Sequence, residues 1–350
     1  MIDKKYHFCT MFDYHYLSRG LALYHSLKSN CPQANLWILC LDVPTYSLLN
    51  SFHLPDVYLI DINEVEIFDK ELAESKLNRS CIEYYFTCNP ALFIYVFHIT
   101  NNIELLTYVD ADLFFYSEPN KYIDEISNYS ISITPHRFQG KIKYLEDKYG
   151  IFNIGWVTIK KDNEGLSCLN RWRKQNIEWC HDRFDNGRYA DQMYLNDWPD
   201  RFDRVKIINH KGINLALFNL ANFNLTLNNK VVYVDEYPLI CYHFFGLKNF
   251  LKLFYYFPID KYNVKPSRVL TNYIYEPYLK SLSTIQNELK SKIHDLNTNS
   301  SIRSEFFPND HHQNIFLKKR IAKILTLLSV ICSSIVHKRF LFFYHNRIRI

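Results

Sequence analysis

Two aspartates separated by one residue follow an apolar segment of the sequence. Residues 104–109 predict a buried strand, and Asp110 and Asp112 come directly after it. Two carboxylates this close repel each other unless a cation lies between them. A hard divalent cation suits oxygen ligands and can bridge to a diphosphate. The pair therefore predicts a metal site at the open end of a strand, although a surface acidic turn is the ordinary alternative.

A second class of enzyme also carries such a pair. Haloacid-dehalogenase-like phosphatases have Asp-x-Asp after a strand, with the first aspartate as nucleophile. They usually have it on the first strand, followed two residues later by Thr or Val. Here several strand and helix units precede the pair, and Leu113 and Phe114 follow it. A phosphatase-like hydrolase is therefore kept as the lesser alternative.

Three further motifs place polar side chains beside predicted strands and helices. Asn153 and Gly155 precede a strand, and the glycine would let backbone approach a ligand; an ordinary turn is the alternative. Asp191 and Gln192 open a helix, where Asp191 could be only an N-terminal cap. His243 ends a strand and could complete a metal site or be structural.

The elements that must position these residues alternate along the chain. Apolar runs predict strands at 6–10, 36–41, 57–60, 104–109, 130–134, 156–160, 231–234 and 239–244. Helical spacing predicts helices at 17–29, 80–99, 168–179 and 189–198. Such alternation predicts an α/β fold with a mostly parallel sheet flanked by helices, which the last two strands finish. Ligands of such sheets bind beyond the carboxyl ends of the strands. Residues 249–310 are weakly patterned.

Composition limits the class of protein. Hydrophobic residues make up 48% and charged residues 22%, which indicates a globular chain. The nine cysteines include no Cys-x-x-Cys pair, which indicates reduced thiols and a cytoplasmic protein. We find no secretory signal and no apolar segment long enough to span a bilayer.

The charge of the chain is concentrated at its end. No acidic residue follows Asp310, whereas eight cations do. They are Lys318, Lys319, Arg320, Lys323, Lys338, Arg339, Arg347 and Arg349. Interleaved with apolar residues, they predict a basic amphipathic helical tail, residues 315–350, that holds the protein on an anionic membrane surface. The body is mildly acidic, so nucleic acid is not an expected partner. A helix packed on the core or a second subunit is the alternative.

The four motifs occur in the order found in family 8 glycosyltransferases, which include glycogenin and bacterial lipopolysaccharide galactosyltransferases. The resemblance covers roughly residues 6–250. It implies a GT-A fold, a nucleotide-sugar donor that is usually UDP-linked, Mn²⁺ or Mg²⁺, and retention of anomeric configuration. It also suggests a saccharide or lipid-linked acceptor in bacterial surface glycan synthesis, at the inner face of the cytoplasmic membrane. Domains are then expected at 1–250 (transferase), 251–314 (extension) and 315–350 (tail).

The resemblance also carries roles onto matching residues. Asp110, Asp112 and His243 resemble the metal ligands, and Asp191 and Gln192 resemble the catalytic pair below the anomeric carbon. Donor contacts are implied for Thr10, Asp13, Tyr16, Arg79, Asp110, Ala111, Asn153, Gly155, Gly246 and Lys248. Lys76 is an alternative to Arg79, and His210 is a further candidate.

The sequence also departs from the family pattern. Lys248 comes one residue early, and Asn249-Phe250 replaces Pro-Trp, which puts the diphosphate contact of Lys248 in doubt. A non-catalytic relic that binds sugar or nucleotide is the non-enzyme alternative. The intact metal-ligand and catalytic positions argue against it.

Overall fold

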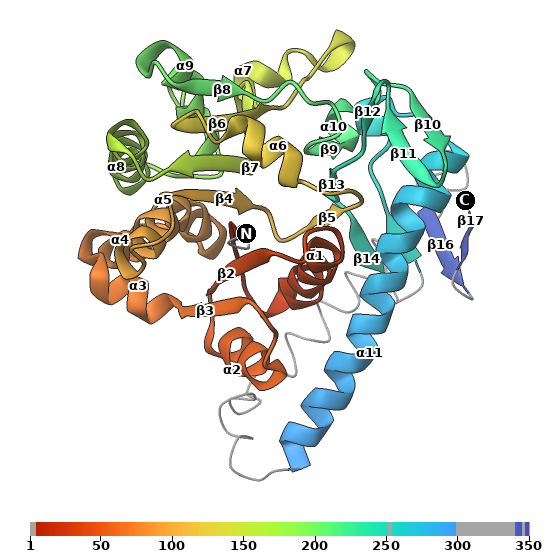
Figure 1. Ribbon diagram of the computed structural model, residues 1–350, viewed down its shortest axis with the longest axis horizontal. Helices are drawn as coiled ribbons and strands as arrows, with labels where there is room; N and C mark the ends of the chain where they lie inside the picture. Colours follow the sequence, from red (N-terminus) through yellow and green to blue (C-terminus); the bar gives the residue numbers. More distant parts are fainter. Residues whose placement is uncertain (1–4, 251–253, 299–339, 345–346, 350) are drawn as a thin grey trace. The chain divides into compact units, whose positions relative to one another are not determined.

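The chain forms two units, Met1–His243 and Phe244–Ile350, in the computed structural model shown in Figure 1. The structure describes residues 5–250, 254–298, 340–344 and 347–349. The domain boundaries expected at residues 250 and 314 stay predictions.

A seven-stranded sheet is the centre of the first unit. Its strands, in spatial order, are β3 (Val57–Asp61), β2 (Ala34–Cys40), β1 (Tyr6–Phe12), β4 (Leu105–Val109), β7 (Phe152–Lys160), β6 (Ile131–Pro135) and β8 (Val205–Ile207). Only β7 runs antiparallel to its neighbours. This confirms the mostly parallel sheet. The strand order reverses between β1 and β4, so a crevice is expected where their carboxyl ends diverge.

Helices flank this sheet (Figure 1). They are α1 (Leu17–Asn30), α2 (Val43–Phe52), α3 (Ile62–Phe68), α4 (Lys70–Ser75), α5 (Cys81–Ile99), α6 (Asn120–Ile126), α7 (Leu145–Tyr149), α8 (Asn163–Glu178), α9 (Trp198–Arg201) and α10 (Leu217–Leu220). Several begin at a capping side chain. Asp42 caps α2, Asp162 caps α8, and Ser80 with Glu83 forms a capping box at α5. These caps fix where the helices start.

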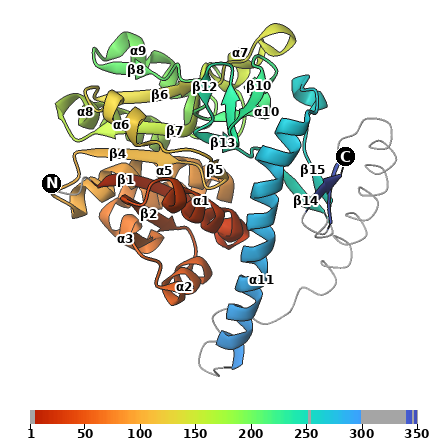
Figure 2. The ribbon, with the colours of Figure 1, turned by 45° about the vertical axis from the view of Figure 1, so that its right-hand side comes forward.

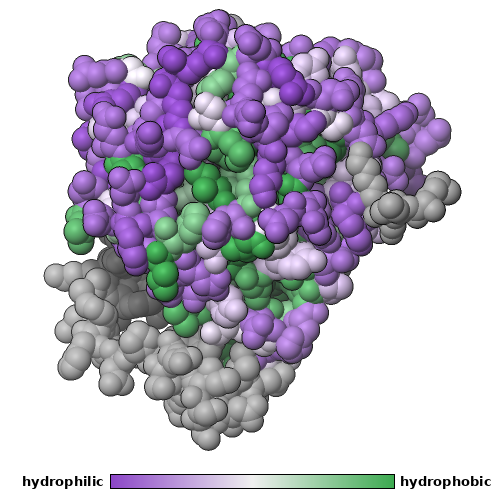
Figure 3. Space-filling view, turned by 60° about the vertical axis from the view of Figure 1, so that its left-hand side comes forward, coloured by the Kyte–Doolittle hydropathy of each residue, from purple (hydrophilic) through white to green (hydrophobic). Residues whose placement is uncertain are grey.

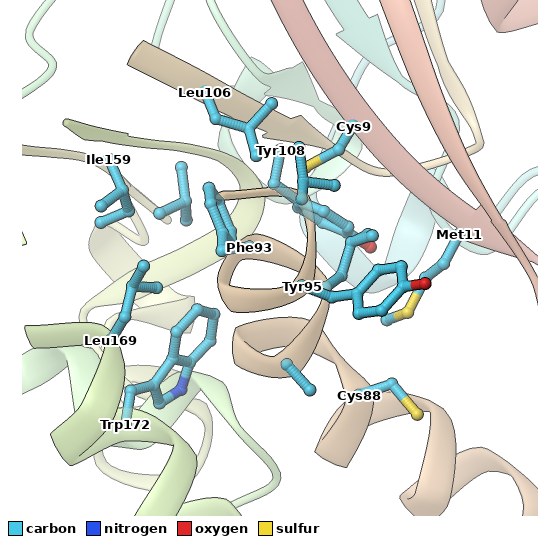
Figure 4. Close-up of a cluster of buried hydrophobic side chains, with 14 of the residues drawn as sticks. Cys9, Met11, Cys88, Phe93, Tyr95, Leu106, Tyr108, Ile159, Leu169 and Trp172 are labelled. Carbon is cyan, nitrogen blue, oxygen red and sulfur yellow. The ribbon is translucent and has the colours of Figure 1, made fainter. Parts of the chain in front are cut away.

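The apolar core lies between α5, α8 and one face of the sheet (Figure 4). Phe93 of α5 and Trp172 of α8 have ring centroids 6.5 Å apart, above Tyr108 of β4 and Ile159 of β7. Alternate residues of the same strands point to the opposite face, where other aromatic rings meet. Phe8, Phe115 and Trp156 form that group, with centroids 6.0 to 6.2 Å apart. The central sheet is thus apolar on both faces.

Two small sheets stand apart from the central one. β5 (Leu113–Phe115), β13 (Cys241–His243) and β9 (Leu215–Ala216) form the first. β10 (Leu225–Asn228), β11 (Val231–Val234) and β12 (Tyr237–Pro238) form the second. The expectation that segments 231–234 and 239–244 finish the central sheet is therefore wrong. The chain turns at Asp110 as it leaves β4, and the β5 edge created there pairs with β13 instead.

The second unit holds a four-stranded antiparallel sheet and a long helix. Its strands are β14 (Lys248–Phe250), β15 (Phe254–Tyr256), β16 (Phe340–Tyr344) and β17 (Arg347–Arg349). A π-helical turn, Leu270–Tyr275, leads into α11 (Glu276–Thr298), which is one continuous helix (Figure 2). This helix falls in the segment that the sequence pattern left unassigned.

The predicted helical tail fits the described residues poorly. Residues 340–344 and 347–349 form strands, because a run of aromatic and apolar residues favours pairing with β15. The rest of residues 315–350 lies outside the described residues. Within the described part of the chain, no helix is long and apolar enough to cross a membrane.

The surface carries scattered apolar side chains. The face in Figure 3 is mostly hydrophilic, with apolar residues gathered near its middle. Among the described residues, Leu77 is 91% exposed and Ile67 is 68% exposed. Exposed apolar residues are ordinary on folded proteins, so we draw no functional conclusion from them.

Candidate metal centre and active site

Three of the predicted ligands converge at the end of β4. Asp110 and Asp112 lie between β4 and β5, and His243 is the last residue of β13. Because His243 pairs with Leu113 across β5 and β13, its ring comes beside both aspartates. His243 Nε2 lies 3.1 Å from Asp112 Oδ1 and 3.5 Å from Asp110 Oδ2. One ligand atom from each residue falls within 4.8 Å of the others.

This donor set suits a divalent cation. Two carboxylates and one imidazole are ligands that Mn²⁺ and related metals accept in proteins. The side chains of Asp112 and His243 are buried, and that of Asp110 is part-buried. The site is therefore shielded on the protein side, and the chemistry of its residues fits the expected metal.

The charges of the three residues are strongly interdependent. Burial raises the pKa of Asp110, the charge of Asp112 adds to it, and His243 opposes it only in part. Burial also acts to raise the pKa of Asp112, but His243 and Arg19 reverse the effect, so that its pKa is lowered. Burial acts to lower the pKa of His243, yet the two aspartates raise it overall. The cluster thus favours positive charge at its centre.

Two residues border this cluster: Tyr16 in the segment after β1, and Arg19 in α1. Arg19 places Nη1 3.7 Å from Asp112 Oδ2, and its guanidinium lies over the Tyr16 ring at 4.4 Å. Burial, followed by the charge of Asp112, raises the pKa of the Tyr16 hydroxyl. Tyr16 thus lies beside the three clustered residues, and its predicted contact with the donor stays a prediction. Arg19 was not singled out from the sequence, because a lone arginine on a helix has no signature.

Asp13 and Thr10 have local roles in the same region. The Asp13 carboxylate accepts from the backbone N–H of His15 and Tyr16 at 3.0 and 3.2 Å, and from the Tyr85 hydroxyl at 3.3 Å. Asp13 therefore shapes the turn that carries Tyr16. Thr10 is fully buried in β1, and its hydroxyl has no hydrogen-bond partner within the described part of the chain.

A β-bulge presents Asn153 and Gly155 to the site. The pairing of β6 with β7 jumps from Ile133–Val157 to Thr134–Asn153, so extra β7 residues bow out of the ladder. The Thr134 hydroxyl donates to the Asn153 and Trp156 carbonyls at 3.2 Å each. The sequence placed this motif just before a strand at 156–160, with an ordinary turn as the alternative, whereas the motif lies inside β7.

Gly155 must be a glycine at this bulge. The Gly155 carbonyl accepts from the Asp110 N–H at 3.3 Å, which links the bulge to the metal ligands. A Cβ on Gly155 would lie 2.7 Å from Asn153 Oδ1 and Asn214 Oδ1 and 2.9 Å from His243 Nδ1. No side chain fits among these three polar atoms, and Asn214 is a site residue that the sequence did not identify.

Asp191 has a different environment from the three clustered residues. It is 3% exposed, and its Oδ2 accepts from Asn89 Nδ2 of α5 at 2.5 Å. Asp191 occupies the N-cap position of the following 3-10 helix, Gln192–Asp197, but its side chain makes no capping bond there. Burial raises its pKa to about 7, and the charge of Asp110 contributes.

The side-chain amide of Gln192 holds it in place. Its Nε2 donates to the carbonyl of Tyr149, the last residue of α7, at 2.7 Å. The Trp172 indole donates to the Asp191 carbonyl at 2.9 Å, which anchors the pair to α8. Both predicted catalytic residues are therefore fixed by neighbouring elements.

Other residues predicted to contact the donor have local contacts, and their predicted roles stay predictions. Arg79 donates to the Asn176 and Ile177 carbonyls at 3.3 and 3.0 Å, at the end of α8, as a helix-terminal cation does. His210 accepts from the Gly212 N–H at 3.2 Å. Ala111 is buried between the two metal-ligating aspartates.

The last two donor contacts belong to the second unit. Gly246 has a φ of 75°, which favours glycine, and Lys248 is exposed at the start of β14. Their predicted contacts with the donor stay predictions.

The chain has clear sequence relatives. It is 32% identical to YfnD of Bacillus subtilis (strain 168), an uncharacterized protein, over 297 residues that cover 83% of this chain and 93% of YfnD. No protein-family model matches the chain.

Solved structures with a similar arrangement carry the names of sugar transferases. Mouse xyloside xylosyltransferase 1 shares 14% identity, with 69% of this chain and 97% of that chain covered and a TM-score of 0.46. The galactosyltransferase LgtC, solved with donor and acceptor sugar analogs, shares 15% identity, with 69% and 87% covered and a TM-score of 0.47.

Proposed function

We propose that this chain, which belongs to the same family as YfnD of Bacillus subtilis, is a metal-dependent glycosyltransferase of the GT-A type. It would move a sugar from a nucleotide-sugar donor, UDP-linked, to a saccharide or lipid-linked acceptor with retention of configuration. The observation that carries the proposal is the convergence of Asp110, Asp112 and His243 at the carboxyl end of β4. The resemblance to family 8 glycosyltransferases, carried by four motifs in order, supports the reaction class.

The metal ligands have a direct part in this reaction. A divalent cation bound there, Mn²⁺ or Mg²⁺, would neutralise the charge that builds on the leaving diphosphate. Asp112 and His243 are buried and would hold it from the protein side, whereas Asp110 is part-buried. The Arg19 guanidinium adds a fixed positive charge near the same place.

Asp191 and Gln192 would act at the sugar. Developing positive charge on the anomeric carbon is stabilised by a nearby carboxylate in a water-poor site. Asp191 suits this role because it is buried and held by Asn89. Gln192 is fixed through Nε2 to the Tyr149 carbonyl and would orient the sugar or the acceptor.

The test is incubation with a panel of nucleotide sugars, with and without Mn²⁺, followed by product analysis. Transfer that requires Mn²⁺, stops in EDTA and returns on metal addition is the expected result. NMR of the product linkage should show the anomeric configuration of the donor. Hydrolysis of a generic phosphoester without any sugar donor would instead indicate the phosphatase. Donor binding without turnover would indicate the relic.

We also propose that the protein works at an anionic membrane surface, with residues 315–350 as the attachment. Each cation near such a surface adds roughly 1 kcal/mol. Because β16 and β17 belong to the second unit's sheet, the test should neutralise charges rather than delete the tail. Replacing Lys318, Lys319, Arg320 and Lys323 by Gln should release the protein from anionic liposomes, whereas Lys141→Gln with Lys143→Gln should not. Unchanged liposome binding would overturn this proposal.

A further inference from the structure

We propose that Asn214 is a positioning residue that decides which nitrogen of His243 faces the metal. In turn, the orientation of Asn214 is set by a buried hydrogen-bonded chain through Asn153 and His136. The inference rests on the metal site of the proposed function, but it does not depend on sugar transfer.

The hydrogen-bonded chain begins at His136, on the segment that follows β6. His136 Nδ1 lies 2.9 Å from the Gly150 carbonyl, so Nδ1 must carry the proton and donate. Burial lowers the pKa of His136 to about 3, so the ring is neutral. Nε2 is therefore an acceptor, and the group 3.2 Å from it is Asn153 Nδ2, which donates. This fixes the Asn153 amide.

The Asn153 amide then fixes the next one. With Nδ2 turned to His136, its Oδ1 accepts from the Gly155 N–H at 2.9 Å and from Asn214 Nδ2 at 2.8 Å. Asn214 Nδ2 also donates to the Thr134 hydroxyl at 3.0 Å. Both donations require the same orientation of the Asn214 amide.

The hydrogen-bonded chain ends at His243. Asn214 Oδ1 lies 3.1 Å from His243 Nδ1, and an amide oxygen can only accept. His243 Nδ1 therefore carries a proton, and Nε2 is the nitrogen presented to Asp112 and Asp110. A metal-bound histidine generally has its other ring nitrogen fixed in this way. The Gly150 carbonyl thus determines which group donates and which accepts in each hydrogen bond from His136 to His243.

The backbone of Asn214 gives a clean way to remove its side chain. Its φ is +54°, in the left-handed region that asparagine and glycine tolerate best. Asn214→Gly therefore deletes the amide without introducing backbone strain. Asn229, exposed in the turn after β10 with a φ of +47°, offers a matched control.

The experiment measures Mn²⁺ binding by the full chain from the EPR signal of free Mn²⁺, with no sugar donor present. Loss of an outer-shell partner typically weakens metal affinity by about 10- to 100-fold, and we expect a loss in this range for Asn214→Gly. Asn229→Gly should bind as the wild type does. Asn214→Asp keeps an oxygen for His243 Nδ1 to donate to but loses the donations to Asn153 and Thr134, and should recover part of the affinity. Thermal unfolding of each variant establishes that it is folded.

The outcomes separate this inference from the proposed function. Wild-type affinity in folded Asn214→Gly would overturn the role of Asn214 and leave the metal site standing. Equal losses in Asn214→Gly and Asn214→Asp would assign Asn214 a merely structural role and also overturn the inference. Failure of the wild type to bind Mn²⁺ would overturn the metal site and this inference together. Intact Mn²⁺ binding without transfer from any nucleotide sugar would count against the proposed function alone.

Discussion

Two carboxylate regions of the first unit have opposite surroundings. Asp112 faces His243 at 3.1 Å and Arg19 at 3.7 Å, and its pKa is lowered. Asp191 is equally buried but faces a neutral amide, Asn89, and burial raises its pKa to about 7. Asp112 is thus arranged for a permanent negative charge that a cation balances. The second region keeps a carboxylate whose charge is unfavourable until something positive arrives.

The difference indicates a division of labour. A metal ligand must be ionised before the substrate binds, so positive groups surround it. A group that stabilises positive charge only in the transition state is best left without a cation of its own, because it then gains most when that charge develops. Substitutions in the two regions should therefore affect different measurements.

The largest effect is expected for Asp112→Asn. Loss of an inner ligand should lower both Mn²⁺ affinity and transfer by more than about 100-fold, beyond the loss expected for an outer-shell partner. EPR of free Mn²⁺ and a transfer assay measure the two. Asp147→Asn, at an exposed position of α7, is the control. Unchanged Mn²⁺ binding in Asp112→Asn would mean that Asp112 does not bind the metal, and the two regions would then not differ in this respect.

Asp191→Asn should lower the transfer activity but raise the stability of the protein. Transfer should fall by about 100-fold, as for the loss of an electrostatic group in an active site, while Mn²⁺ affinity stays unchanged.

The same variant should unfold less readily at alkaline pH. The folded pKa of Asp191 is about 7 and the unfolded value is 3.8, so wild-type stability falls as pH rises between these values. Asparagine does not ionise, so the variant should be more stable by up to about 4 kcal/mol at pH 8, and the gain should vanish near pH 4. Urea unfolding at both pH values measures it. A gain that does not change with pH would mean that Asp191 is not destabilised by burial.

A third prediction concerns His136, whose neutral ring starts the chain behind His243. Its folded pKa of about 3 lies below the unfolded value of 6.5, so it contributes stability above pH 6.5 that is lost as pH falls toward 3. Its ring stacks on Phe138 at 4.6 Å, so His136→Phe keeps the packing.

The stability difference between wild type and His136→Phe should shrink by about 2 kcal/mol between pH 7 and pH 5. Asp191 titrates in both proteins, so its contribution cancels. Paired urea unfolding curves measure the difference. A difference independent of pH would show that the ring is not held neutral.

The smallest effect is expected for Arg19→Gln. Arg19 competes with the metal for the charge of Asp112, and a part-buried pair of this kind is worth up to about 1 kcal/mol. Mn²⁺ affinity without donor should therefore rise about two- to fivefold. Weaker binding in this variant would mean that Arg19 supports the cluster instead of competing with it.

Some of this site could be predicted from sequence because the signal is local. Asp110 and Asp112 follow an apolar run, and a strand that ends in two acids places them at a sheet edge. His243 carries no such signal of its own, and only the resemblance of its motif identified it. Its place depends on β13 pairing with β5, a contact between residues far apart in the chain.

Other parts left no local trace. Asn214 and His136 are buried polar residues that lie outside any predicted strand or helix, and a sequence cannot tell a buried amide from an exposed one. The bulge in β7 made a strand look like a turn before a strand. Strands of two or three residues, such as β9 and β13, are too short to show a period. The central sheet was predictable because its strands are long and apolar.

The position of His243 bears on how the protein is made. It is the last residue of the first unit, so the imidazole leaves the ribosome after the whole of the central sheet. Until then the nascent chain contains the two aspartates and Arg19, but not the imidazole that lies beside both carboxylates. The three-residue centre can therefore form only when the final residue of the first unit has emerged.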